Sequence, residues 1–285
     1  TAFPLNDQPY ASLFKIYQKE FLDVSVEKGL IHKDSLALAG DGTPVVTSHR
    51  ERKKRICKCK ENGINDCSCD RYFSQPDCDI GWDSSRDCFY HGYDLYMLVD
   101  SQSDLPVFPH YSYASKHDSH GFLQAFFRMR AFLPDYKVSK VLLDSAHDAM
   151  PYYQYFKRQN ITPFIDLNGK GGRPPVYKND FTIDKDGVPV CPSGHRMRRD
   201  GIEVAKGRMK FKCPKISHTG GCISCTCDKP CSKAKYGRTV HLILNDNPRL
   251  FNNPPRSSKE WKLEYNARTS AERSNKREKL DFKLE

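Results

Sequence analysis

Four residues near the end of the chain are spaced so that their side chains would share one face of a helix. Tyr265, Arg268, Glu272 and Lys279 lie at offsets of 0, 3, 7 and 14 residues. With a rotation of about 100° per residue, an α-helix would bring them into a sector about 60° wide. A carboxylate among a phenol and two cations is a poor core, but it suits a divalent metal ion beside a phosphodiester. The alternative is a charged, solvated surface helix.

Two further acids follow short apolar runs that have the length of buried strands. Asp41 follows Leu36-Ala-Leu-Ala-Gly, and Asp144 follows Ser139-Lys-Val-Leu-Leu. Catalytic acids often occupy such strand ends, although Asp41-Gly could also be an ordinary turn. Two-metal phosphoryl transfer needs closely grouped carboxylates, and carboxylate oxygens suit Mg²⁺ or Mn²⁺. We therefore expect Asp41, Asp144 and Glu272 to form one metal-binding cluster, with Asp41 as the bridging ligand and Arg268 orienting Glu272 or gripping a phosphate.

The overall charge favours a polyanionic partner. The 285 residues carry a formal net charge of +11, and Lys and Arg gather in residues 50–60, 194–215 and 256–283. A basic surface alone is also common in proteins that bind no nucleic acid, so the charge supports this class of partner without requiring it. The chain contains no run of about 18 apolar residues, so no membrane-spanning helix is expected. No secretory signal is recognisable.

The apolar periodicity predicts the order of the elements. Strands are expected near residues 36–41, 90–100, 105–113, 139–144 and 161–166, and helices over 119–132, 148–158 and 262–282. Asp118 is expected to cap the first of these helices. The strand–helix–strand order after residue 139 predicts parallel pairing through a right-handed crossover, and the two strands before it predict a hairpin. The predicted fold is α/β, with a mixed sheet of five strands and flanking helices.

The 12 cysteines fall into two groups, one in residues 48–88 and one in residues 167–262. Disulfides are the weaker interpretation without a secretory signal. In the second group Cys222 and Cys225 form one closely spaced pair, and Cys191 with His195 or Cys213 could complete a structural Zn²⁺ site, with simple reduced thiols as the alternative. The proposed ligands there are Cys191, Cys213, Cys222 and Cys225.

The first cysteine group fits zinc less well by its spacing. Cys57-x-Cys59 and Cys67-x-Cys69 have gaps of one residue, which are less usual in zinc modules. The sequence therefore favours the second group as a zinc site. The stretch around the first group is polar and basic with little periodicity, which indicates an insertion or an irregular metal-stapled loop.

Taken together, these segments resemble a known family. Asp41-Gly-Thr, Tyr90-His-Gly-Tyr-Asp-Leu, Leu142-Leu-Asp144-Ser-Ala-His-Asp and Tyr265-x2-Arg268-x3-Glu272-x6-Lys279 are similar to motifs of the DDE transposases of bacterial insertion sequences. The last motif matches all four positions of the Y-R-E-K signature that defines one group within them. The resemblance covers roughly residues 35–283.

The resemblance implies an RNase H-like architecture. An N-terminal helical segment (1–34) would precede the first part of the catalytic core (35–166), which carries the Cys-rich insert 48–88. A basic, Cys-rich insertion (167–262) and the final catalytic helix (263–285) would complete the chain.

The resemblance also implies an activity. The family cleaves DNA at inverted-repeat ends and joins the freed 3′-hydroxyl to target DNA in a Mg²⁺-dependent reaction. Asp41, Asp144 and Glu272 would be the metal ligands, and Tyr265, Arg268 and Lys279 would contact the transposon end. Double-stranded DNA is then the expected partner, a homodimer is expected by analogy, and the expected location is the bacterial cytoplasm, in association with the nucleoid. The alternatives are an inactive descendant that binds DNA through zinc modules and an RNase H-like nuclease without strand transfer.

Overall fold

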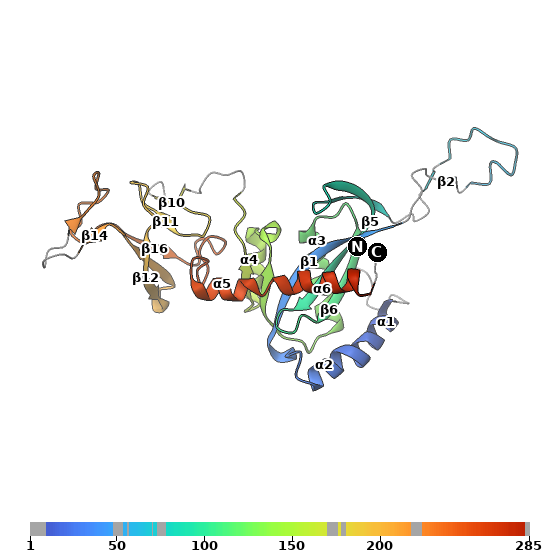
Figure 1. The fold of residues 1–285 in the computed structure, drawn as a ribbon, viewed down its shortest axis with the longest axis horizontal. Coiled ribbons are helices and arrows are strands. Elements are labelled where there is room, and N and C mark those ends of the chain that lie inside the picture. Colours follow the sequence, from blue (N-terminus) through green and yellow to red (C-terminus); the bar gives the residue numbers. More distant parts are fainter. Residues whose placement is uncertain are drawn as a thin grey trace. The chain divides into compact units, whose positions relative to one another are not determined.

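The computed structural model describes residues 10–47, 54–55, 57–69, 71–72, 78–169, 176–177, 181–217 and 224–282 (Figure 1). The chain forms two compact units. The first consists of Thr1–Ser139 together with Arg268–Glu285, and the second consists of Lys140–Ala267. None of the described helices is long and apolar enough to cross a membrane.

A mixed sheet of six strands is the main feature of the fold. Its order is β4 (Asp79–Asp83), β5 (Cys88–Asp100), β1 (Leu36–Val46), β7 (Val138–Leu143) and β8 (Thr162–Ile165), and β6 (Pro106–Tyr113) also pairs with β5. β5 is antiparallel to β1, β4 and β6, whereas β7 and β8 are parallel. The predicted mixed α/β class is confirmed, with one strand more than the five expected. The extra strand, β4, was hidden because Asp-Ile-Gly-Trp-Asp has weak strand preference.

The strand that carries Asp41 is longer than its sequence suggests. β1 runs through Gly42 and Pro44, and Asp41 pairs with Met97 in the middle of it. The expectation that Asp-Gly and Pro would end the strand was wrong. A proline removes only its own N–H from the ladder, so pairing with one long neighbour can carry the strand past it.

Helices of the first unit cover the sheet with aromatic side chains. The N-terminal helical run comprises α1 (Tyr10–Tyr17), a π-helical turn (Gln18–Leu22) and α2 (Asp23–Glu27), and a 3₁₀ turn (Lys33–Ser35) leads into β1. α3 (Asp118–Phe132) buries Phe122, Phe126 and Met129, which recur at helical spacing. Its N-cap is His117, whose ring accepts a hydrogen bond from the Ser119 N–H. The expected cap, Asp118, is instead the first helical residue.

The end of the chain forms two helices in place of the single one predicted. α5 (Lys259–Asn266) stops before Ala267, and α6 (Thr269–Leu280) follows after Arg268. α6 packs against β1 and β5 within the first unit, where Figure 1 shows it lying across the sheet. Its buried positions are small or short: Ser270, Ala271, Ser274 and Asn275. These side chains let the helix backbone come close to the strands.

The second unit contains short strands with a core of their own. Beside a 3₁₀ turn (Ser145–His147) and α4 (Met150–Arg158), it contains three small antiparallel sheets. These are β9–β10–β11 (Val176–Tyr177, Phe181–Ile183, Pro189–Val190), β12–β13–β16 (Arg198–Glu203, Arg208–Lys212, Thr239–Ile243) and β14–β15 (Ile216–Ser217, Ser224–Cys225), with a 3₁₀ turn at Val204–Lys206. Ile183, Met209, Phe211 and Leu242 lie in their shared core.

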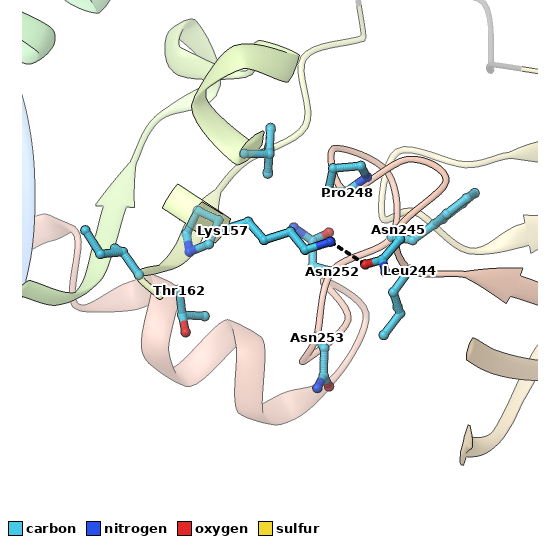
Figure 2. Close-up of a pocket in the computed structure, with 11 residues that line it drawn as sticks. Lys157, Thr162, Leu244, Asn245, Pro248, Asn252 and Asn253 are labelled. Carbon is cyan, nitrogen blue, oxygen red and sulfur yellow. Dashed lines mark hydrogen bonds between the residues drawn. The ribbon is translucent and has the colours of Figure 1, made fainter. Parts of the chain in front are cut away.

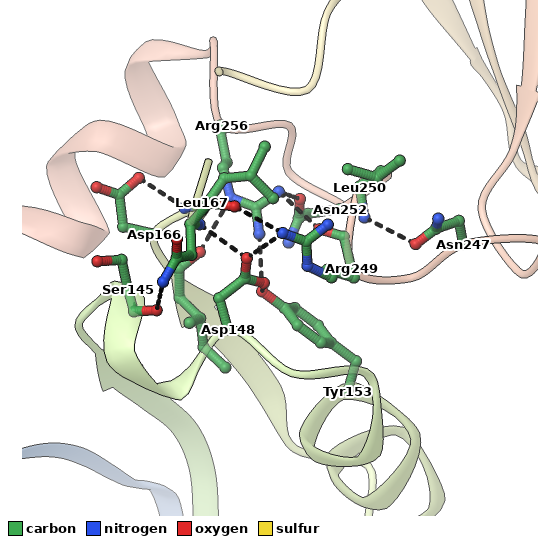
Figure 3. A network of polar contacts seen from close by, with 12 residues as sticks. Ser145, Asp148, Tyr153, Asp166, Leu167, Asn247, Arg249, Leu250, Asn252 and Arg256 are labelled. Atoms are coloured by element: carbon green, nitrogen blue, oxygen red, sulfur yellow. Dashed lines mark hydrogen bonds and ion pairs between the residues drawn. The ribbon is translucent and has the colours of Figure 1, made fainter. Parts of the chain in front are cut away.

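A buried polar network fastens the segment before α5 to the rest of the second unit (Figure 3). Arg256 is 3% exposed and donates hydrogen bonds to the Ile165 carbonyl (2.9 Å) and the Tyr153 hydroxyl (2.8 Å). The Tyr153 hydroxyl in turn donates to Asp148 (2.9 Å), which also pairs with Arg249 (2.6 Å). Asp148 is thus neutralised by Arg249, while the buried Arg256 guanidinium is satisfied by hydrogen bonds to neutral acceptors.

Candidate functional site

Two of the three predicted metal ligands belong to the first unit. Asp41 is half-buried in the middle of β1, and Glu272 lies in the first turn of α6, which packs on β1 and β5. The Glu272 side chain is 48% exposed and forms an ion pair with Arg268, one turn before it. A guanidinium at this position can hold the carboxylate in one orientation. An acid on the helix and an acid on the strand beneath it are thus supplied by one compact unit.

The third predicted ligand, Asp144, belongs to the second unit. It directly follows β7, and its carboxylate accepts a hydrogen bond from the Ala146 N–H (3.1 Å) at the start of a 3₁₀ turn. His147 Nδ1 lies 2.6 Å from Asp144 Oδ1, and the ring of His147 is buried. The carboxylate is held in place from two sides while its side chain stays 37% exposed. Convergence of Asp144 with Asp41 and Glu272 stays a prediction.

The four signature residues do not share one continuous helix. Tyr265 lies on α5 in the second unit, where its ring stacks on Trp261 at 4.6 Å between centroids. Arg268 precedes α6, and Glu272 and Lys279 lie on it. The helix is interrupted at Ala267 and Arg268, although both residues keep right-handed helical backbone angles. The shared face of the four side chains stays a prediction. The roles of Tyr265, Arg268 and Lys279 in DNA contact stay predictions.

Two acids that the sequence analysis did not assign to a site lie beside β1. Asp94 on β5 and Asp118 at the start of α3 both place a carboxylate oxygen against Gly42. A Cβ atom built on Gly42 would lie 2.7 Å from Asp118 Oδ1 and 3.1 Å from Asp94 Oδ1. The absence of a side chain at Gly42 is what leaves room for both carboxyl groups. The only available sequence signal was an acid inside an otherwise apolar strand.

Asp94 is a buried acid whose ionised form is poorly stabilised. It is 7% exposed, and its Oδ2 atom is buried without a hydrogen-bond partner. Burial, followed by the negative charges of Asp118 and Asp41, raises the pKa of Asp94 to about 7. The surroundings of Asp41, Asp94 and Asp118 therefore have an excess of negative charge, which favours a proton or a cation.

Ion pairs anchor α6 at the turn between β5 and β6. Arg273 donates from Nε to Asp104 Oδ2 (2.7 Å) and from Nη2 to Asp104 Oδ1 (2.6 Å), and Arg277 reaches the same carboxylate (3.1 Å). The two-pronged contact with Arg273 fixes both distance and angle. These contacts set the position of the helix that carries Glu272.

The cysteines come together in the first group, which the sequence analysis had ranked lower. Four sulfur atoms all lie within 4.8 Å of one another, and this set could hold a metal such as zinc: Cys57, Cys59, Cys67 and Cys69. In the second group, Cys191 and Cys213 are buried. Cys222 and the side chain of Cys225 lie outside the described residues, so that predicted quartet stays a prediction. The sequence spacing did not indicate this cluster, because a tight turn brings the two Cys-x-Cys pairs of the first group together.

A pocket of about 220 Å³ lies in the second unit between α4 and the segment before α5 (Figure 2). Lys157 donates a hydrogen bond to Asn245 Oδ1 (2.6 Å) at its edge, and Asn252 and Asn253 also line it. No Asp or Glu is among the eleven residues that line this pocket. It therefore offers hydrogen bonds from amides and one ammonium, and no carboxylates for a metal ion.

Comparisons with protein-family models, with curated proteins and with solved structures found no match for this chain.

Proposed function

We propose that this chain is the catalytic region of a DDE transposase with an RNase H-like fold. In this proposal Asp41, Asp144 and Glu272 act together in divalent-metal-dependent cleavage of DNA at transposon ends and in strand transfer. The observation that carries the proposal is the packing of α6, with Glu272 and its partner Arg268, on the strand that contains Asp41. Asp41 and Glu272 are more than 200 residues apart in the sequence, yet both belong to the first unit, which supports a shared role.

Two further observations support the proposal. The strand order β4-β5-β1-β7-β8, antiparallel on the β5 side of β1 and parallel between β7 and β8, is compatible with an RNase H-like sheet. The formal net charge of +11 suits double-stranded DNA as the substrate. A homodimer would allow two transposon ends to be handled together.

The residues fit a divalent cation by their chemistry. Carboxylate oxygens are the ligands that Mg²⁺ and Mn²⁺ prefer. The partnerless buried Oδ2 atom of Asp94 and the raised pKa of that group indicate surplus negative charge beside Asp41, which a cation would neutralise. Asp41, Asp144 and Glu272 would hold the metal, which would supply charge stabilisation at the attacking and leaving oxygens.

In the proposed reaction the chain positions the reacting groups. Water adds to a backbone phosphorus, the P–O3′ bond breaks, and the 3′-oxygen leaves as a hydroxyl after taking a proton. That hydroxyl then attacks a phosphorus of the target strand and displaces another 3′-oxygen. Arg268 would hold the Glu272 carboxylate in place during both steps, and Lys279 would neutralise a neighbouring phosphate.

The test uses the purified full chain and linear DNA that carries the inverted repeats flanking its gene. We expect Mn²⁺- or Mg²⁺-dependent cleavage and a joined product. Asp41→Asn, Asp144→Asn and Glu272→Gln should each reduce cleavage by at least about a hundredfold, because a lost ligand removes several kcal/mol of transition-state stabilisation. Glu260→Gln, at an exposed acid on α5, is the matched control and should cleave normally.

Three results would count against this function. Cleavage that survives all three substitutions would exclude these acids as metal ligands. Tight binding of the repeat ends without cleavage would favour an inactive DNA-binding descendant, and cut ends without joined product would favour a nuclease.

A further inference from the structure

The loop that contains the four clustered cysteines has a compact, turn-based shape. It lies between two short antiparallel strands, β2 (Lys54–Arg55) and β3 (Arg71–Tyr72). Within it the Ile64 N–H donates to the Cys59 carbonyl (2.8 Å), and Gly63 adopts a left-handed conformation with φ of 78°. This turn brings the second Cys-x-Cys pair back against the first.

No apolar core holds this loop together. Residues 57–69 are all exposed or half-buried, and Ile64, the one aliphatic residue among them, is 51% exposed. A segment that buries so little apolar surface cannot offset the conformational entropy lost on ordering. Small modules of this kind are usually held by disulfides or by a metal ion.

The sulfur geometry separates these two explanations. Cys57 Sγ lies 3.4 Å from Cys67 Sγ, and Cys59 Sγ lies 3.6 Å from Cys69 Sγ. A disulfide would bring each pair to about 2.05 Å. Four thiolates at about 2.3 Å from a tetrahedral Zn²⁺ would be separated by about 3.8 Å, which is close to the spacing found.

The four sulfur atoms are also close enough for their charges to matter, because all of them lie within 4.8 Å of one another. Four thiolates at this spacing would need a divalent cation to balance their charge.

We propose that Cys57, Cys59, Cys67 and Cys69 bind one Zn²⁺ and that this ion folds the loop between β2 and β3. Tetrahedral sites with four sulfur ligands select zinc or iron. Four protein ligands leave no open position for substrate, so the ion is structural. The proposal is independent of the proposed transposase activity, because none of the acids of that activity takes part in it.

Metal content and spectroscopy on the full chain test the proposal. Reduced protein is purified with Zn²⁺, and metal per chain is measured for the wild type, for Cys59→Ser/Cys67→Ser, and for Cys88→Ser. Cys88 is an exposed thiol outside the loop and serves as the matched control. We expect the double variant to hold one equivalent of zinc fewer than the wild type and the control. This difference is informative even if the second cysteine group binds zinc as well.

Cobalt and proteolysis provide the second readout. Exchange with Co²⁺ should give tetrahedral thiolate absorption bands whose intensity falls in the double variant only. Zn²⁺ should protect Lys58 and Lys60 from trypsin in the wild type and the control. Equal zinc content in all three proteins, a Cys57–Cys67 disulfide without metal, or one equivalent of iron in place of zinc would each overturn the proposal. Folding of the double variant is checked by circular dichroism, which should be unchanged because the loop contributes nothing to the core.

Discussion

Asp94 and Asp118 direct their carboxylates at the same glycine of β1, with Oδ1 atoms 3.1 Å and 2.7 Å from the point where a Cβ of Gly42 would lie. One acid comes from a strand and the other from the first turn of α3. Two carboxylates so close together cannot both ionise at low cost inside a folded unit. The acid–base behaviour of the first unit should therefore be dominated by this pair.

The pH dependence of stability should reveal Asp94 directly. Its folded pKa of about 7 exceeds its ordinary value of 3.8. The folded chain thus binds this proton more tightly, so stability should fall as the pH rises from about 4 to about 7 and then level off, at a total cost of about 4 kcal/mol. Asp94→Asn should remove this fall, which makes it more stable than the wild type at pH 8. Urea unfolding at several pH values, without added divalent ions, measures the effect.

A substitution at an exposed aspartate serves as the control for this prediction. Asp135 is exposed at the end of α3, and Asp135→Asn should leave the pH profile as it is. A wild-type stability that rises from pH 4 to pH 7, with the same slope in Asp94→Asn, would show that the pair does not carry the effect.

Gly42→Ala should destabilise the first unit. The added methyl group would press against both carboxylates, and we expect a loss of about 1–3 kcal/mol, as for other overpacked sites. Gly169→Ala is the control, because a Cβ there meets nothing within 4 Å. Unfolding curves for the two variants should diverge; equal stabilities would mean that the carboxylates move aside freely.

The anchor between Arg273 and Asp104 should be measurable as a coupling energy. Asp104 has a φ of 60°, a conformation that Asn tolerates, so Asp104→Asn removes the charge without straining the turn. Because the Arg273 side chain is 50% exposed, we expect a coupling of only about 1 kcal/mol in a double-mutant cycle with Arg273→Ala.

The same ion pair has a characteristic pH dependence. The hydrogen bond from Arg273 lowers the pKa of Asp104, so the stabilisation is present above pH 4 and is lost as the pH falls below it. A coupling that persists at pH 2 would contradict an electrostatic origin.

Arg256→Met should weaken the second unit more than any exposed substitution. It leaves the Tyr153 hydroxyl, the Asn252 side chain and two carbonyls without their donor. Loss of one partner from a buried charged network costs about 3–5 kcal/mol. Trp261 fluorescence in a Trp82→Phe background reports on this unit, since the Arg256 guanidinium lies 5.9 Å from the Trp261 ring. Arg158→Met, at the exposed end of α4, should change little.

The sequence predicted the regular elements well where apolar spacing was strong. Every strand expected between residues 36 and 166 exists. Of the apolar residues at helical spacing in α3, Phe122, Phe126 and Met129 are buried, whereas Leu123 and Phe127 are exposed. The small sheets of the second unit were not predicted, since strands such as Arg198–Glu203 are short and polar, with no fully buried residue. Their stability comes from Met209, Phe211 and Leu242, which meet only after the chain has folded.

The sites were less predictable than the fold because they depend on tertiary contacts. Helical periodicity predicted one helix over residues 262–282, but nothing in it indicated the interruption at Ala267 and Arg268. The sequence around Asp94 did not mark it as a site residue, because Asp118 comes close to it only when α3 packs beside the sheet. The cysteine spacing did not reveal that the first group would cluster, since that depends on the left-handed turn at Gly63.

The return of α6 to the first unit has a consequence for synthesis on the ribosome. The helix that rests on β1 is encoded more than 200 residues after that strand, with the whole second unit between them. During translation the surface of β1 that binds α6 stays uncovered until the whole second unit has been made, and Glu272 is added only after that unit. Any chemistry that needs both Asp41 and Glu272 is thereby withheld until α6 has been synthesised.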